Sequence, residues 1–281
     1  MNNNKLRIVL VNLGFRRAMY PLVTPPMGIM SLAAYLRKEL DVEIKLINQR
    51  LDNLSTEDLT KEICDFNPDI VGLGTLTIFS YLIDDISKIV KERLPDVWIL
   101  IGGPHASSVR GEIFNEFKEI DIVVPGEGEV ALKHIVESYP ERESLKNIPG
   151  IVWKNKDGEV IENPGVLPVV EDLNQLPIPA YDLIDLTKYW KRQSMAPIPF
   201  RKYASVVSSR GCPYQCMWCH RIFGRKIRMY SAERIVEEIE YLQNKYRIND
   251  FEFLDDNFNF DSKRVLDFSE LVSKKGLKFK A

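Results

Sequence analysis

The sequence has few cysteines and no long apolar run. Four cysteines in 281 residues are too few for the dense disulfide framework of small secreted domains, and three of them fall within eight positions. No stretch reaches the roughly 18 apolar residues of a membrane span, and the N-terminus lacks the small-residue cleavage site of a secretory signal. We therefore expect a cytoplasmic protein without a membrane span.

The sequence also lacks a strong excess of either charge. Its net charge of −2 gives no basis for non-specific binding to nucleic acid or to a membrane surface. Acidic and basic residues alternate along the predicted helices, which favours solvated helix faces. The length is enough for about two domains, each with its own apolar core.

Strands and helices alternate along the first half of the chain. Ser55, followed three positions later by Asp58, resembles a capping box at one helix start. Five βα units in a row predict an α/β domain over residues 1–145, with a flavodoxin-like (Rossmann-like) five-stranded parallel sheet in the order 2-1-3-4-5. The predicted strands cover residues 6–13, 42–47, 69–76, 97–103 and 121–126, and the predicted helices cover residues 27–39, 55–66, 80–94, 107–118 and 127–138.

The pattern changes over residues 146–200. Asp157-Gly158 between two short strand-like runs is a hairpin signal, and the six prolines between positions 164 and 200 indicate a linker. A second βα series then fills residues 201–281, with strands at 203–209 and 250–255, helices at 231–246 and 262–275, and the start of a strand at 277–280. Ser231 is a good N-cap for the first of these helices.

Two and a fraction βα units cannot close a barrel. We therefore expect residues 201–281 to be the beginning of a TIM-like βα barrel, in a fragment of a longer protein.

Glycines mark the carboxyl ends of four of the five strands predicted in the first domain. Ligands bind an open α/β sheet at this edge, beside the switch point between strands one and three, and glycine lets a ligand approach the backbone. With Thr75, Thr77 and His105 among them, the glycines predict a site for a large ligand, although they could also serve only tight turns. The glycines are Gly14, Gly72, Gly74, Gly102, Gly103, Gly126 and Gly128.

Four segments at these positions resemble the cobalamin-binding domain that precedes many radical S-adenosylmethionine enzymes. They are PPMGIMSLAAYLR (25–37), GLGTLT (72–77), GGPHAS (102–107) and PGEGE (125–129). The resemblance covers roughly residues 5–140 and implies that these loops hold the nucleotide tail of cobalamin, with His105 as a hydrogen-bonding residue rather than a cobalt ligand. The implied contacts are Thr75, Thr77, Gly102, Gly103, Gly126 and Glu127.

The sequence departs from the wider cobalamin-binding group after its first strand. Cobalamin mutases and methionine synthase carry Asp-x-His-x-x-Gly there, and that histidine ligates cobalt. This chain has Asn12-Leu13-Gly14-Phe15-Arg16-Arg17 instead. The resemblance then implies base-off cobalamin without a histidine ligand, with residues 15–20 near enough to lie below the cobalt.

The three clustered cysteines, Cys212, Cys216 and Cys219, have the spacing C-x3-C-x2-C within SSRGCPYQCMWCH. Thiolates are the standard ligands of iron–sulfur clusters, and three on a four-iron cube leave one iron open. Structural zinc needs four ligands, and His220 is poorly placed as the fourth because it directly follows Cys219. Inert clustered thiols are the other alternative. Cys64 lies at an apolar helix position and is interpreted as a buried, inert thiol.

The cysteine motif follows the first strand of a βα series and closely resembles the signature of radical S-adenosylmethionine enzymes. The resemblance implies that the open iron binds the amino and carboxylate groups of S-adenosylmethionine and that Trp218 flanks the adenine, unless Trp218 only packs in the loop. Asp255 and Asp256, at the end of the second barrel strand, would hold the amino group or merely cap a helix. Arg225 and Arg228 would face the carboxylate or the solvent.

Together these features predict a cobalamin-dependent radical enzyme with a [4Fe–4S] cluster, S-adenosylmethionine and cobalamin as cofactors. The resemblance implies methyl transfer, or cyclisation or rearrangement, at an unactivated carbon of a small-molecule or peptide substrate. It also implies a reductant such as flavodoxin or ferredoxin. Two alternatives stay open: a cobalamin-binding carrier module, against which the intact cysteine motif argues, and an iron–sulfur electron-transfer protein, against which the missing fourth cysteine argues.

Overall fold

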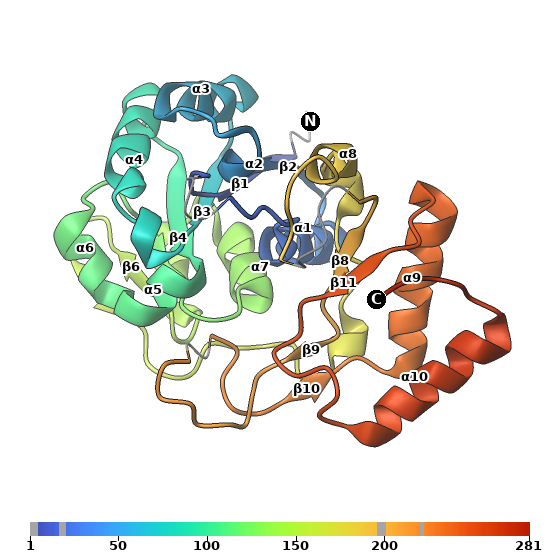
Figure 1. The fold of residues 1–281 in the computed structure, drawn as a ribbon. Helices are drawn as coiled ribbons and strands as arrows, with labels where there is room; N and C mark the ends of the chain where they lie inside the picture. The colour runs from blue at the N-terminus through green and yellow to red at the C-terminus, as the bar shows by residue number, and fades with distance from the viewer. Residues whose placement is uncertain (1–4, 17–20, 196–200, 220–221) are drawn as a thin grey trace. The chain divides into compact units, whose positions relative to one another are not determined.

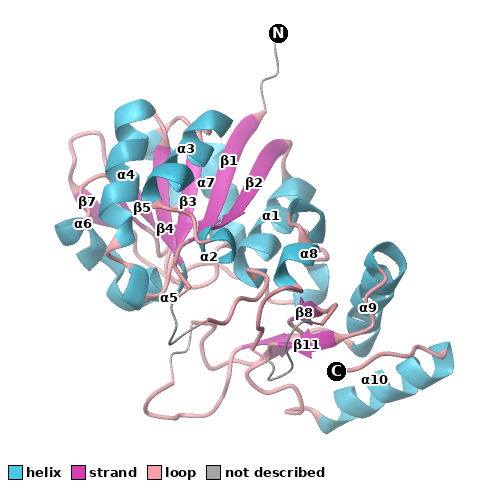
Figure 2. Cartoon of the chain, turned by 45° about the horizontal axis from the view of Figure 1, so that its top comes forward, coloured by secondary structure: helices cyan, strands magenta, loops and turns pink. Residues whose placement is uncertain are grey.

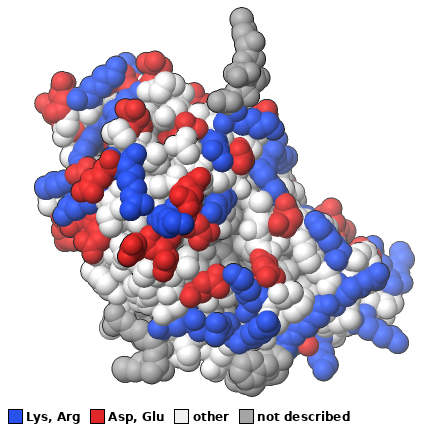
Figure 3. Space-filling view, turned by 90° about the horizontal axis from the view of Figure 1, so that it is seen from above, with Lys and Arg blue, Asp and Glu red and all other residues white. Residues whose placement is uncertain are grey.

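The computed structural model describes residues 5–16, 21–195, 201–219 and 222–281, and the chain forms two compact units (Figure 1). One unit comprises residues 1–17 and 28–169, and the other comprises residues 18–27 and 170–281. Within the described ranges, no helix has the length and apolar character needed to cross a membrane. Acidic and basic side chains are intermingled on the face drawn in Figure 3, as their alternation in the sequence leads us to expect.

The first unit is built on a mixed sheet of seven strands with the order β2-β1-β3-β4-β5-β6-β7 (Figure 2). Its apolar runs are buried in parallel register, so that Ile8 pairs with Ile44 on one side and with Ile70 on the other. The predicted parallel order 2-1-3-4-5 is confirmed. The parallel strands are β1 (Leu6–Asn12), β2 (Val42–Asn48), β3 (Ile70–Gly74), β4 (Trp98–Gly102) and β5 (Ile122–Val123).

The expectation of a purely parallel, five-stranded sheet was wrong at one edge. β6 (Val152–Lys154) and β7 (Val160–Glu162) form the predicted hairpin, but they extend the sheet as antiparallel strands. Trp153 pairs with Ile122 and is completely buried, and its indole nitrogen donates to Asn163 Oδ1 over 3.0 Å. The hairpin joins the sheet because its apolar face must be buried and because it covers the open edge of β5.

Helices cover both faces of this sheet, with α3 and α4 on one face and α1 and α7 on the other (Figures 1 and 2). The cap of α3 is confirmed, since the Ser55 hydroxyl accepts from the Asp58 backbone N–H over 3.0 Å and donates to the Asp58 carboxylate over 2.7 Å. Cys64 on α3 is half-buried against the apolar core, and burial raises the pKa of its thiol. The helices are α1 (Met27–Glu39), α2 (Gln49–Asp52), α3 (Thr56–Phe66), α4 (Leu82–Arg93), α5 (Gly103–Val109), α6 (Ile113–Glu116) and α7 (Glu129–Ser138).

One predicted helix of this unit differs in position and continuity. The expected helix over 107–118 begins earlier, at Gly103, immediately after β4. It is interrupted at Arg110, whose φ of +48° is incompatible with a continuing right-handed helix, and a short 3-10 turn joins α5 to α6. The early start places His105 inside α5, at the carboxyl end of β4.

The second unit contains the parallel pair β8 (Ala204–Val206) and β11 (Phe251–Phe253), connected through α9 (Ala232–Tyr246) and followed by α10 (Ser262–Lys275). The predicted cap of α9 is confirmed, because Ser231 accepts from the Arg234 backbone N–H. The strand expected at 277–280 is reduced to one parallel bridge between Lys280 and Asp250. A second, antiparallel pair consists of β9 (Ser209–Arg210) and β10 (Arg228–Met229).

The segment expected to be a linker has structure of its own. It contains a 3-10 turn at Leu173–Gln175, another at Tyr181–Leu183 and the short helix α8 (Leu186–Tyr189). Tyr181 and Tyr189 are completely buried within the second unit. The segment is therefore anchored by large aromatic side chains. Pro197 and Pro199 lie outside the described residues.

Candidate functional site

The carboxyl ends of β3 and β4 bring together most of the predicted ligand contacts. Gly74 pairs with Gly102, and the His105 backbone N–H donates to the Thr75 carbonyl over 3.2 Å. Gly103 has a φ of +83°, and a Cβ there would lie 3.5 Å from the Thr75 backbone nitrogen. This region favours glycine and leaves the backbone open to a ligand at the sheet edge.

His105 is the one buried imidazole among the described residues at this edge. Its Nδ1 lies 3.3 Å from the Thr77 hydroxyl, whereas its buried Nε2 has no hydrogen-bond partner within the described structure. Burial lowers the pKa of the ring, an effect partly offset by Glu116, and this favours the neutral imidazole. A buried polar atom without a partner is costly, and it fits a site where a polar ligand group supplies the missing bond.

Ser107 joins the β4 and β5 loops of this edge. Its hydroxyl donates to the Gly103 carbonyl over 2.8 Å and accepts from the Gly126 backbone N–H over 2.8 Å. Glu127, the next predicted contact, is buried between β5 and α7. The sequence prediction did not include Ser107, although its place four residues after Gly103 on a predicted strand-to-helix turn was a usable signal.

Exposed apolar side chains follow β3 at the same edge. Leu76, Ile78 and Tyr81 are 41%, 66% and 51% exposed. Sequence reasoning missed them, although three large apolar residues within six positions, directly after the glycines of β3, were visible. An apolar surface next to a few polar groups is typical of sites for large cofactors.

Two of the predicted glycines serve packing instead of a ligand. A Cβ on Gly72 would lie 2.8 Å from Leu10 Cδ2, and a Cβ on Gly14 would lie 3.0 Å from the Phe79 ring. At these two positions close packing against a neighbouring side chain explains why the residue is glycine.

The loop after β1, proposed to lie below a cobalt ion, is described only in part. Phe15 packs against the apolar core. The Arg16 backbone N–H donates to Asn53 Oδ1 over 2.9 Å, and its Nε donates to the Arg50 carbonyl over 3.1 Å. Residues 17–20 lie outside the described residues.

In the second unit, the cysteine motif lies on a loop closed at its base by β9 and β10. Arg210 pairs with Arg228, and the Cys212 backbone N–H donates to the Gly224 carbonyl over 3.3 Å. Gly211 has a φ of +87°, and a Cβ there would lie only 2.3 Å from the Lys226 carbonyl oxygen. The residue before the first cysteine must therefore be glycine for the loop to close in this way.

The three cysteines supply the donors of a three-thiolate site without forming a compact one. Cys212 is half-buried, Cys216 and Cys219 are exposed, and the Cys219 backbone N–H donates to the Cys216 carbonyl in a turn. Within the described ranges, no three His, Cys, Asp or Glu side chains are gathered closely enough to hold a metal ion. Trp218 is 87% exposed on the same loop, and His220, the alternative zinc ligand, lies outside the described residues.

The two aspartates predicted to hold S-adenosylmethionine differ in environment. Asp255 is mostly buried and accepts from the backbone N–H and hydroxyl of Ser208 and from the hydroxyl of Ser209. Burial raises the pKa of its carboxyl, while these hydrogen bonds and Arg264 oppose the rise. Asp256 is exposed. Asp255 therefore fastens β9 to the end of β11, and Asp256 is the carboxylate that faces solvent.

The two arginines after the cysteine loop also differ in burial. Arg228 is buried and donates to the Val170 carbonyl over 2.7 Å, whereas Arg225 is exposed. Arg228 therefore ties the loop base to residue 170.

Comparison with known proteins finds a matching domain model and several similar proteins. Residues 16–136 match the B12 binding domain. An uncharacterized methyltransferase of Pyrococcus horikoshii is 36% identical over 255 residues, covering 90% of this chain and 53% of the relative. The anaerobic magnesium-protoporphyrin IX monomethyl ester cyclase of Rubrivivax gelatinosus is 27% identical, with 90% of this chain and 45% of the relative covered. The chain thus spans about half the length of these relatives.

A solved structure shares the fold. The cobalamin-dependent S-adenosylmethionine radical enzyme OxsB, with aqua-cobalamin and S-adenosylmethionine bound, superposes with a TM-score of 0.81 at 22% identity. The match covers 99% of this chain and 38% of that enzyme. Residues 16–136 are therefore similar to the B12 binding domain, and the chain shares its fold with part of the OxsB enzyme.

Proposed function

We propose that this chain is the cobalamin-binding and S-adenosylmethionine-binding part of a radical enzyme that modifies an unactivated carbon. The observation that carries the proposal is the presence of two separate sets of residues in one chain. The first unit has a glycine-rich edge with the unpartnered His105 Nε2, and the second has the C-x3-C-x2-C loop. A carrier module would need only the first set, and an electron-transfer protein only the second.

In the first unit, the backbone at Gly102, Gly103 and Gly126 admits the nucleotide tail of cobalamin close to the sheet edge. In the tautomer whose Nδ1 accepts from the Thr77 hydroxyl, His105 Nε2 would donate to a polar group of that tail. The exposed side chains of Leu76 and Ile78 cover apolar surface of the corrin.

In the second unit, which we infer to be the beginning of a βα barrel, the thiolates of Cys212, Cys216 and Cys219 would hold three irons of a four-iron cluster. The bound cluster would supply an electron for the reductive cleavage of S-adenosylmethionine, and cobalamin would supply methyl-transfer chemistry. Trp218 would contact the adenine, and Asp256 would accept from the amino group of S-adenosylmethionine.

Methyl transfer is the net reaction we favour, because the P. horikoshii relative is named a methyltransferase. Ring closure is the second candidate, because the R. gelatinosus relative is named a cyclase. The substrate is a small molecule or a peptide, and a flavodoxin or ferredoxin supplies the electron.

The test is an anaerobic titration of the reconstituted, reduced protein with S-adenosylmethionine, followed by electron paramagnetic resonance. We expect S-adenosylmethionine to change the cluster signal and 5′-deoxyadenosine to form. An unchanged signal with no 5′-deoxyadenosine would favour the electron-transfer alternative. The Asp256→Asn variant should need more S-adenosylmethionine for the same change.

A further inference from the structure

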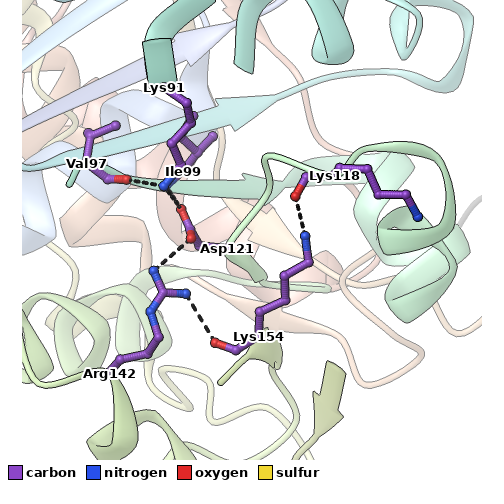
Figure 4. A network of polar contacts seen from close by, with 7 residues as sticks. All are labelled: Lys91, Val97, Ile99, Lys118, Asp121, Arg142 and Lys154. Atoms are coloured by element: carbon purple, nitrogen blue, oxygen red, sulfur yellow. Dashed lines mark hydrogen bonds and ion pairs between the residues drawn. The ribbon is translucent and has the colours of Figure 1, made fainter. Parts of the chain in front are cut away.

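A polar network lies at the opposite edge of the first sheet, where β4 and β5 begin (Figure 4). Asp121 directly precedes β5 and is buried at its centre. Lys91 Nζ lies 2.9 Å from Asp121 Oδ2, and an Arg142 guanidinium nitrogen lies 2.7 Å from Asp121 Oδ1. Because ligands of the glycine-rich edge approach the carboxyl ends of the strands, this network belongs to a different place on the unit.

Both oxygens of the Asp121 carboxylate have donors within this network. Its Oδ2 also accepts from the Ile99 backbone N–H over 2.7 Å, and its Oδ1 is occupied by Arg142. Lys91 in turn donates to the Val97 carbonyl over 2.7 Å. The network therefore sets one aspartate against two cations, so positive charge is in excess at this place.

Three further lysines lie beside the network without a carboxylate. Lys154 Nζ donates to the Lys118 backbone carbonyl, and Lys118 Nζ donates to the Phe114 carbonyl over 3.1 Å. Lys156 is exposed and makes no hydrogen bond or ion pair in the described parts of the chain. Burial lowers the pKa of Lys154, and Lys118 and Lys91 add to the fall, while Asp121 and Glu119 oppose it.

These side chains line an open pocket of about 570 Å³. Five basic side chains face two acidic ones in its wall, and one of those acids, Asp121, is already paired. Pockets that hold small molecules span about 300–1,000 Å³, so the volume suits a compact ligand. An excess of cations, one of them partly buried, is relieved by an anion with several oxygen acceptors.

We propose that this pocket binds a small phosphorylated anion through Lys118, Lys154 and Lys156. Phosphate oxygens would accept from the ammonium groups of Lys118 and Lys154, whose hydrogen-bond partners among the described residues are backbone carbonyls. Arg142, held by Asp121, forms the wall. The proposal is independent of the cobalamin site, because the residues come from the other ends of β4, β5 and β6.

The test is calorimetric titration of the whole chain with inorganic pyrophosphate and, separately, with ADP. We expect pyrophosphate to bind and the double variant Lys118→Met/Lys154→Met to weaken its Kd by about tenfold or more, since charge-assisted hydrogen bonds are lost. ADP binding tighter than pyrophosphate would identify a nucleotide as the ligand, and equal binding would identify the phosphate group alone.

Matched variants keep the test independent of folding and of the other edge. Lys156→Met should also weaken binding, and its exposed side chain removes no internal contact. Lys61→Met on α3, whose side chain is 68% exposed and pairs only with Asp65, should leave the pyrophosphate Kd unchanged. Absence of pyrophosphate binding, or equal Kd values for the wild-type chain and the pocket variants, would overturn the proposal.

Discussion

The hydroxyl of Tyr181 lies 2.8 Å from Oε1 of Glu238, and both side chains are buried inside the second unit. The same hydroxyl lies 2.7 Å from the Ser205 carbonyl of β8. A single residue of the proline-rich segment thus contacts both β8 and α9. Arg234, one turn before Glu238 on α9, lies 3.4 Å from its other carboxylate oxygen.

This contact predicts that Tyr181→Phe destabilises the protein by about 1–3 kcal/mol, because the variant removes a buried hydroxyl that lies within hydrogen-bond distance of the Ser205 carbonyl and the Glu238 carboxyl. Denaturant unfolding measures the change. Tyr241→Phe on α9 is the control, since its hydroxyl accepts from the exposed Lys245 and its loss should cost far less. Equal unfolding free energies for the two variants would show that the Tyr181 contact stabilises nothing.

The glycine-rich edge makes a prediction about cobalamin. Gly103→Leu should weaken hydroxocobalamin binding at least about tenfold, because its side chain would enter the space beside Thr75 and its backbone is held at positive φ. Gly158→Leu is matched for backbone strain, with a φ of +81° against +83° and no atom within 4 Å of a Cβ. If both variants bind hydroxocobalamin like the wild-type chain, the ligand does not lie on this edge.

The base of the cysteine loop makes a prediction about iron. Gly211→Ala should reduce iron incorporation, because its Cβ would lie 2.3 Å from the Lys226 carbonyl and force β9 and β10 apart. Gly224→Ala, at a φ of +73° with open space around it, should retain most of the iron. Iron and sulfide content is measured for both variants after anaerobic reconstitution. Identical iron content would show that closure of the loop base is not needed for iron incorporation.

Substitutions of the two aspartates after β11 should have different effects, one on stability and the other on the affinity for S-adenosylmethionine. Asp256→Asn should weaken S-adenosylmethionine binding and leave unfolding unchanged. Asp255→Asn should change stability, because Ser208 and Ser209 depend on its oxygens. A weaker affinity in Asp255→Asn at unchanged stability would reverse these assignments.

The raised pKa of Asp255 adds a pH dependence to this pair. Its folded state binds a proton more readily than its unfolded state, so this carboxyl makes the protein less stable as pH rises from the ordinary aspartate pKa to the raised one. Above that window the cost is constant. Unfolding free energies measured across mildly acidic pH should therefore lack this pH-dependent fall in stability in Asp255→Asn and retain it in Asp256→Asn.

Local patterns predicted much of this molecule because they depend on neighbouring residues. Apolar runs predicted the five parallel strands, and the succession of βα units, as in flavodoxin-like folds, predicted their order. The Ser55 and Ser231 caps follow from residues three positions apart. The addition of β6 to the edge of β5 depends on a pairing between Ile122 and Trp153, and no local pattern encodes it.

The same limit applies to the sites. The glycines after β3 and β4 were visible in the sequence, but only the fold shows that Gly72 packs against Leu10 while Gly103 borders Thr75. Likewise, Asp255 and Asp256 look alike in sequence. Their difference arises because Ser208 and Ser209, nearly fifty residues earlier, reach only one of them.

The most direct test for two separable cofactor sites is the cofactor content of the chain after anaerobic reconstitution with iron, sulfide and hydroxocobalamin, followed by desalting. We expect about four irons and one corrinoid per chain, with a base-off cobalt(II) signal on reduction. The triple replacement of Cys212, Cys216 and Cys219 by alanine should lose the iron and keep the corrinoid, whereas Cys64→Ala should keep both. Iron without corrinoid in the wild-type chain, or loss of both cofactors in the triple variant, would contradict two separable sites.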